Sequence, residues 1–99
     1  MIIIKSSLFS LWYDSLDMSQ KIQVDTRLTK ILVDSHFGLY KRLGNICELK
    51  FRSGIRIYYA FDKDVLVLLL NGGGKTSKRK QSQDIEKARE IFKEYFDGK

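Results

Sequence analysis

The apolar residues of this chain recur with the period of a helix up to residue 34 and with a period of two after Gly38. Residues on one face of a helix are three or four positions apart, whereas residues on one face of a strand are two apart. The change of period therefore predicts helices followed by a sheet. A further helical stripe lies near the C-terminus, and this order of elements is typical of an α+β domain.

Two amphipathic helices are expected before Gly38. Phe9 begins an apolar stripe that continues at i+3, i+4 and i+7, and Ser6 or Ser7 can cap this helix. Ser19 is the expected cap of a second, longer helix. The apolar stripe of that helix contains Val24, Leu28, Ile31 and Leu32. We expect the two helices to form a hairpin that follows a short N-terminal edge strand.

Strands are expected at residues 39–43, 46–52, 55–61 and 65–70, the first of them weak. The two middle strands alternate apolar and polar residues, which predicts one apolar and one polar face for each. The last strand, entered through a tight turn at Asp62–Asp64, is a continuous apolar run. Such a run favours a central strand that is buried on both faces and covered by helices on one side.

The end of the chain is expected to form a mobile basic loop and a third helix. The glycines at 72–74 indicate a hinge, and four of the next six residues are cations. Ser82 is the expected cap of a helix whose apolar face begins at Ile85. The predicted fold class is therefore α+β: an N-terminal edge strand and a helical hairpin packed on a small antiparallel sheet, with a C-terminal helix.

The two middle strands are expected to form a hairpin that gathers positive charge. If both apolar faces reach the same core, the register places Arg52 opposite Arg56 and Lys50 opposite Tyr58, with Glu48 on the same polar face. Like charges that face each other directly on a hairpin cost up to ~1 kcal/mol. An anion that both cations hold would offset this repulsion, so the pattern indicates an anion-binding face.

The positive charge is concentrated in the middle of the chain. The formal net charge is +6, and residues 36–80 contain ten Lys or Arg against three acidic residues, a net of +7. A localised positive field attracts polyanions, and nucleic acid is the commonest polyanion that a small cytosolic protein meets. The charge pattern therefore favours a nucleic-acid partner over a membrane surface, because no helix combines a basic face with a bulky apolar face.

Length and cysteine content narrow the class further. The 99 residues suit one compact domain, residues 1–99. The single cysteine, Cys47, has no partner for a disulfide and no cluster of Cys or His for a metal, so it is expected in a buried strand. The sequence has neither a signal-peptide core nor an apolar run of ~20 residues that could span a membrane. We expect a cytoplasmic protein without a metal or a small-molecule cofactor.

Several short stretches, in this order and spacing, resemble the addiction-module killer proteins, which are HigB-like members of the RelE/ParE toxin superfamily. The resemblance covers nearly the whole chain. The matching residues are Phe9 to Trp12, Arg27-Leu28, Glu48-Leu49-Lys50, Gly54-Ile55-Arg56-Ile57-Tyr58-Tyr59, Leu68-Leu69-Leu70 with Gly72-Gly73, Lys78-Arg79, and Asp84-Ile85 with Ala88.

This resemblance implies the toxin of a type II toxin–antitoxin system. Such a toxin is a ribosome-dependent endonuclease that enters the ribosomal A site and cuts messenger RNA. A ribose 2′-hydroxyl attacks the adjacent phosphate, so the chemistry requires a base, cations for the phosphate and an acid for the leaving oxygen, but no metal. The implied partners are the messenger RNA, the ribosome and a cognate antitoxin, a small helix-turn-helix DNA-binding protein.

The resemblance also implies roles for individual residues. By position, Lys50 matches a basic residue that serves the ribosome-dependent members, and Arg56 matches the arginine that holds the phosphate. Glu48 is the alternative base, and Lys78 or Arg79 from the basic loop could act as the acid or as a further clamp. The residues expected to bind RNA or its phosphates are Arg42, Arg52, Tyr58, Lys75, Arg79 and Lys80.

Two other functions fit the same sequence. One is a toxin that resembles the ParE branch, which poisons DNA gyrase by binding it and has no nuclease activity. The other is an RNA-binding module whose basic hairpin holds backbone phosphates without cutting them.

Overall fold

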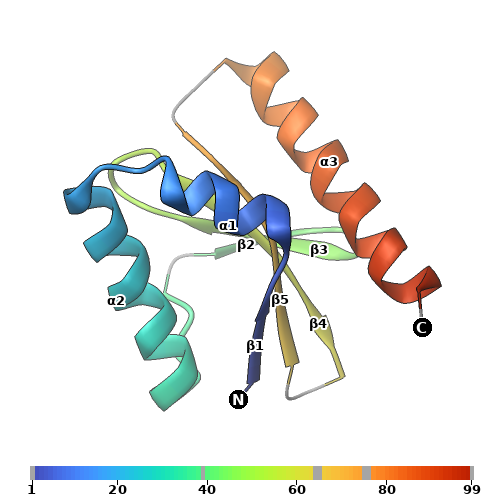
Figure 1. Ribbon diagram of the computed structural model, residues 1–99, viewed down its shortest axis with the longest axis horizontal. Helices are drawn as coiled ribbons and strands as arrows, with labels where there is room; N and C mark the ends of the chain where they lie inside the picture. The colour runs from blue at the N-terminus through green and yellow to red at the C-terminus, as the bar shows by residue number, and fades with distance from the viewer. Residues whose placement is uncertain (1, 39, 64–65, 75–76, 99) are drawn as a thin grey trace.

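The computed structural model describes residues 2–38, 40–63, 66–74 and 77–98. The elements, in chain order, are β1 (Ile2–Lys5), α1 (Ser7–Asp14), α2 (Met18–Asp34), β2 (Tyr40–Leu43), β3 (Ile46–Lys50), β4 (Arg56–Asp62), β5 (Leu66–Gly73) and α3 (Lys78–Asp97). The strands form one five-stranded sheet, with α2 on one side of the molecule and α3 on the other (Figure 1). This arrangement confirms the predicted α+β class, with its edge strand, helical hairpin and C-terminal helix.

The strands follow the order β1-β5-β4-β3-β2, so β4 is central and β1 lies at one edge. The strands from β2 to β5 pair antiparallel with their neighbours in sequence. In contrast, β1 pairs with β5 in parallel, with Ile2 beside Leu66 and Lys5 beside Leu69. The predicted antiparallel sheet is therefore extended by one parallel strand from the other end of the chain.

Both faces of the sheet are covered, each by its own apolar core. On one face, Phe9 of α1 and three buried residues of α2 pack against Leu49, Ile57 and Tyr59. On the other face, Ala88 of α3 packs against Ile46, Tyr58, Ala60 and Leu70. Since successive residues of a strand point to opposite faces, adjacent residues of β4 serve different cores. The polar face predicted for β3 and β4 is consequently covered by α3.

The helix caps agree with the sequence at one helix and differ at two. The Ser6 side chain accepts a hydrogen bond from the Phe9 amide and caps α1, as predicted. The cap of α2 is Asp17, in a capping box with Gln20, and not Ser19. The cap of α3 is Ser77, whose hydroxyl accepts from the Lys80 amide, and not Ser82. In both corrected helices the first turn precedes the buried apolar stripe, so the stripe does not mark where the helix begins.

The predicted glycine hinge belongs to β5. Gly72 and Gly73 continue the strand and pair with Ile57 and Arg56 of β4. A Cβ at Gly72 would lie 2.2 Å from the Trp12 ring, and one at Gly73 would lie 2.5 Å from a carboxylate oxygen of Asp84. These glycines are therefore explained by the close approach of one side chain on each face, and not by a need for flexibility.

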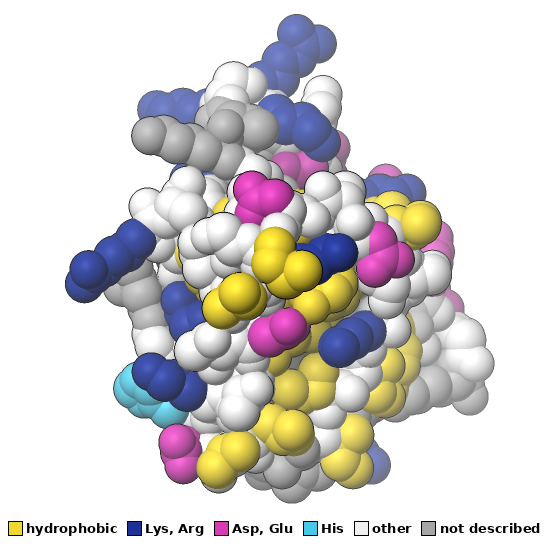
Figure 2. Space-filling view, turned by 60° about the vertical axis from the view of Figure 1, so that its left-hand side comes forward, with side chains coloured by type: hydrophobic (Ala, Val, Ile, Leu, Met, Phe, Trp, Pro, Cys, Tyr) yellow, Lys and Arg dark blue, Asp and Glu magenta, His cyan; other side chains and the backbone are white. Residues whose placement is uncertain are grey.

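Some apolar residues of α2 remain exposed. Leu32, predicted to share the buried stripe, is 49% exposed, and the adjacent Val33 is 72% exposed. Figure 2, with the α2 side of the molecule turned forward, shows hydrophobic side chains at the surface between separate charged groups. The buried stripe of α2 is thus restricted to Val24, Leu28 and Ile31.

Three positions named in the strand predictions, Leu39, Asp64 and Val65, lie outside the described residues. Within the described part of the chain, no helix combines the length and the apolar character needed to cross a membrane.

Candidate functional site

The β3–β4 hairpin has a different register from the one predicted. Lys50 pairs directly with Arg56, and Glu48 pairs with Tyr58. The predicted pairs, Arg52 with Arg56 and Lys50 with Tyr58, are wrong by two positions. Because a shift of two preserves the alternation of faces, the predicted set of side chains on each strand face is unchanged.

The register differs because the connection between the strands is longer than the predicted three-residue turn. The Phe51 amide donates to the Ile55 carbonyl at 3.1 Å, and the Gly54 amide donates to the Phe51 carbonyl at 3.0 Å. Gly54 has φ +95°, a conformation that favours glycine. Arg52 lies in this turn and not in β3. It therefore lies beyond the last pair of the hairpin, Lys50 with Arg56.

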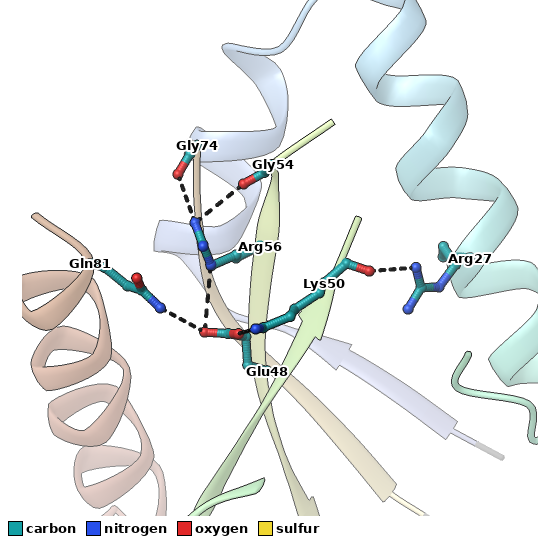
Figure 3. Close-up of polar contacts among 7 residues, drawn as sticks. All are labelled: Arg27, Glu48, Lys50, Gly54, Arg56, Gly74 and Gln81. Atoms are coloured by element: carbon teal, nitrogen blue, oxygen red, sulfur yellow. Dashed lines mark hydrogen bonds and ion pairs between the residues drawn. The ribbon is translucent and has the colours of Figure 1, made fainter. Parts of the chain in front are cut away.

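Lys50 and Arg56 both approach the carboxylate of Glu48. The Lys50 Nζ lies 3.9 Å from Glu48 Oε1, and the Arg56 Nε lies 3.8 Å from Glu48 Oε2 (Figure 3). The two cations are thus on the same face of the sheet, as the candidate site requires. Both distances are long for ion pairs, which typically close to 2.7–2.9 Å when hydrogen-bonded, so the cations surround the carboxylate loosely.

Arg56 also bridges two segments at the end of the sheet. Its Nη1 lies 3.4 Å from the Gly54 carbonyl in the hairpin turn and 3.5 Å from the Gly74 carbonyl just after β5. The side chain is 22% exposed. The Nε edge of the guanidinium therefore faces the buried Glu48, and its outer end lies at the rim of the site, the exposed end of the sheet. The contacts of this outer end with the two carbonyls are long, and an anion could replace them.

Glu48 lies beneath these cations and is almost fully buried. It is 1% exposed, and its Oε2 accepts a hydrogen bond from Gln81 Nε2 of α3 at 3.3 Å. Its cross-strand partner Tyr58 is also fully buried. The prediction of an outward polar face is therefore wrong for both residues, because α3 covers this part of the sheet.

The buried environment also affects the Tyr58 hydroxyl. Burial raises the pKa of Tyr58 above its ordinary value, and the nearby carboxylates of Glu48 and Asp84 raise it further. Tyr58 therefore remains a neutral phenol under ordinary conditions. Since its side chain is buried, the proposed contact of Tyr58 with RNA is contradicted.

The basic residues of the predicted loop belong to the first turn of α3. Lys78, Arg79 and Lys80 follow the Ser77 cap and are exposed. The Lys80 Nζ binds the Asp84 carboxylate at 2.7 Å, one helical turn later. These cations are therefore attached to a helix and not to a mobile loop. Lys75, the other predicted member of this group, lies outside the described residues.

The two basic residues of β2 lie on opposite faces of the sheet. Arg42 pairs with Cys47, whose side chain is in the core on the α1 and α2 side. Arg42 is therefore on the opposite face from Glu48 and is not part of the site. Lys41 pairs with Glu48 and lies on the same face as the site. Lys41 was not among the predicted site residues, because the weak alternation of this strand does not indicate which residues face which side.

Gln81 and Arg27 were also missed. Gln81 holds Glu48 from α3, and no feature of the sequence indicates this contact. The Arg27 guanidinium donates to the Lys50 carbonyl at 2.9 Å (Figure 3). It also donates to the Phe37 carbonyl at 2.9 Å and lies over the Phe51 ring. It connects α2 to the end of β3. Arg27 therefore fixes the backbone from which the Lys50 side chain extends.

The charges and exposures limit the chemistry of this site. Lys50 and Arg56 supply two positive charges against the single negative charge of Glu48, so the cluster has an excess of one. The Lys50 side chain is 41% exposed, whereas Glu48 is buried. The arrangement can bind an anion at its rim through the two cations. Among the described residues, no group of His, Cys, Asp and Glu has the arrangement of a metal site.

Solved structures with a similar fold are bacterial toxins from E. coli. The isolated RelE toxin superposes with a TM-score of 0.65 at 19% identity, covering 86% of this chain and 95% of that one. A doubly substituted RelE variant in the free state gives a TM-score of 0.65 at 18% identity, with 86% and 94% covered. The intact RelBE toxin–antitoxin complex gives 0.60 at 20% identity, with 78% and 98% covered. At these identities the likeness concerns the fold.

The comparison of sequences gives the family. None of the curated proteins compared with this chain matches it. The model of the family described as phage-derived protein Gp49-like (DUF891) matches residues 13–93, which include α2, the whole β3–β4 hairpin and most of α3. Because this match covers most of the chain, the protein belongs to the phage-derived Gp49-like family.

Proposed function

We propose that this protein is the toxin of a type II toxin–antitoxin system, related to the HigB-like killer proteins. The shared fold with the RelE toxin supports this proposal, and the RelBE complex offers the model for a cognate antitoxin. The antitoxin is proposed to be a small helix-turn-helix DNA-binding protein. The toxin acts in the cytoplasm as a ribosome-dependent endonuclease that cuts messenger RNA in the ribosomal A site.

The observation that carries this proposal is the direct pairing of Lys50 with Arg56 at the rim of the sheet. Two cations held this close repel each other unless an anion lies between or above them. Glu48 neutralises only one of them from below. A phosphate of the RNA backbone supplies the second negative charge from the exposed side.

The proposed reaction needs no metal and uses these cations on the scissile phosphate. Arg56 holds the phosphate oxygens through the outer end of its guanidinium, because its planar fork can donate to two oxygens at once. We assign the base to Lys50, the more exposed of the two: its Nζ, in the uncharged form, takes the proton of the attacking 2′-hydroxyl as that oxygen bonds to phosphorus and the bond to the leaving 5′-oxygen breaks. Lys78 or Arg79, in the first turn of α3, supplies the acid for the leaving 5′-oxygen or a further clamp.

The test is a cleavage assay with purified protein and messenger RNA, with and without ribosomes. The wild-type protein is expected to cut only when ribosomes are present. Arg56→Ala is expected to reduce the rate roughly 100- to 1000-fold, because it removes a charged donor from the transition state. Lys93→Ala is the matched control, since it removes the same charge from an exposed position near the end of α3.

The other outcomes distinguish the alternatives. Inhibition of gyrase supercoiling without RNA cleavage would support a ParE-like toxin in place of a nuclease. Binding of RNA that weakens steeply with salt, without cleavage, would support a binding module. Equal loss of activity in Arg56→Ala and Lys93→Ala would reject the proposed site.

A further inference from the structure

The Glu48 carboxylate lies where three elements meet. It belongs to β3, it contacts the Arg56 Nε of β4 at 3.8 Å, and it accepts from Gln81 of α3 at 3.3 Å (Figure 3). Its other oxygen faces the Lys50 Nζ at 3.9 Å. A buried carboxylate is unfavourable unless cations or hydrogen-bond donors compensate it. Of the three contacts only the one from Gln81 is a hydrogen bond, and the two cations are attracted to the carboxylate by charge at longer range.

The burial of Glu48 argues against direct contact with RNA. A general base must come within about 2.6–3.2 Å of the hydroxyl that it deprotonates. Glu48 is only 1% exposed, with the sheet beneath it, α3 at its side and the two cations at its oxygens. In this arrangement a ribose hydroxyl meets Lys50 and Arg56 before it can approach Glu48.

We propose that Glu48 is a positioning residue, which holds the Nε edge of Arg56 and the Nζ of Lys50 so that both cations present their free sides to the RNA phosphate. Gln81 in turn holds the carboxylate and couples the start of α3 to the site. The identity of the anion rests on the proposed function. The restraint of Arg56 by Glu48 is a property of the free protein and can be measured without RNA.

The substitution Glu48→Gln separates positioning from proton transfer. Glutamine preserves the size of the side chain and can still contact Gln81, but it no longer carries the charge that attracts the two cations. Arg56 then loses the partner on its Nε edge. Displacement of a reacting group by about 1 Å can reduce a rate 100-fold, so kcat is expected to fall roughly 10- to 100-fold.

The affinity for substrate should not fall with the rate in Glu48→Gln. Glu48→Gln raises the net positive charge of the cluster by one, which strengthens its attraction for a phosphate. We therefore expect KM to stay constant or to fall while kcat falls. The pH profile of kcat should keep its shape at a lower level, because a positioning carboxylate contributes no proton-transfer step. A weaker change of the same kind is expected for Gln81→Met.

The experiment has two parts. The first uses NMR of the free protein to compare the Arg56 Nε–Hε signal and its hydrogen exchange in the wild type, Glu48→Gln and Gln81→Met, with Lys93→Ala as control. Faster exchange or a shifted signal in Glu48→Gln is expected. The second measures kcat, KM and the pH profile of RNA cleavage, with circular dichroism and thermal unfolding to confirm that each variant is folded.

The results distinguish the two proposals. An unchanged Arg56 signal in Glu48→Gln would overturn the positioning role, whatever the activity. Loss of the acidic limb of the pH profile in Glu48→Gln would identify Glu48 as the base and would also overturn it. If the wild type cleaves no RNA, the proposed nuclease function fails, and the NMR comparison still decides whether Glu48 positions Arg56.

Discussion

Replacing Gly72 with alanine tests the close packing between β5 and α1. The added Cβ would lie 2.2, 2.3 and 2.4 Å from three carbons of the Trp12 indole. Carbon atoms in contact are about 3.5–4.0 Å apart, so the ring or the strand must move by more than about 1 Å. Overpacking of this kind costs typically 1–3 kcal/mol. Gly72→Ala is therefore expected to lower the free energy of unfolding by that amount.

Urea denaturation and thermal unfolding measure this loss. For a domain of this size, 1 kcal/mol corresponds to a change in Tm of about 4–8 °C. Gly74→Ala is the matched control, because nothing lies within 4 Å of a Cβ at that position. In a Trp12→Leu background, Gly72→Ala should cost clearly less. Equal stability of Gly72→Ala and Gly74→Ala, or an unchanged cost in the Trp12→Leu background, would refute the packing argument.

Two further predictions concern the groups that support the site. Arg27→Lys should lower the free energy of unfolding by about 1–3 kcal/mol in urea denaturation, because arginine uses two separate nitrogens for the Lys50 and Phe37 carbonyls and lysine has only one. A loss below about 0.5 kcal/mol, the ordinary range for a surface substitution, would contradict this role. The pKa of Tyr58 is higher in the folded state than in the unfolded state, so folding favours the neutral phenol. Its contribution to the free energy of unfolding is therefore complete below a pH of about 10 and is lost as the pH rises further, because the unfolded chain then releases the proton more readily. Urea denaturation at pH 8 and pH 11 should therefore show a smaller alkaline loss for Tyr58→Phe than for the wild type, and identical losses would argue against the buried phenol.

The order and type of the elements were predictable because the apolar pattern records which residues are buried. The helix boundaries were less predictable. The stripe of α3 begins at Ile85, but the helix begins at Lys78, because residues 78–84 are all polar and an apolar pattern does not register them. The glycines of β5 were predicted as a hinge because a sequence does not reveal that Trp12 and Asp84 approach the strand there.

The candidate site was predictable only in part. The alternation in β3 and β4 correctly grouped Lys50 with Arg56 on one face, and this grouping survived an error in register. The burial of Glu48 and Tyr58 was not predictable, because alternation distinguishes the two faces of a strand without showing whether a helix covers the polar one. The contact from Gln81 depends on the docking of α3, which local sequence does not specify.

The parallel pairing of β1 with β5 has a consequence for how the protein folds during its synthesis. Ile2 to Lys5 leave the ribosome early, but their partners, Leu66 to Leu69, emerge only after most of the chain has been made. Until then the isoleucines of the first strand have no neighbour in the sheet. Such long-range contacts slow folding, whereas the β3–β4 hairpin depends on nearby residues. The edge of the sheet is therefore completed late, after the cationic hairpin has had time to form.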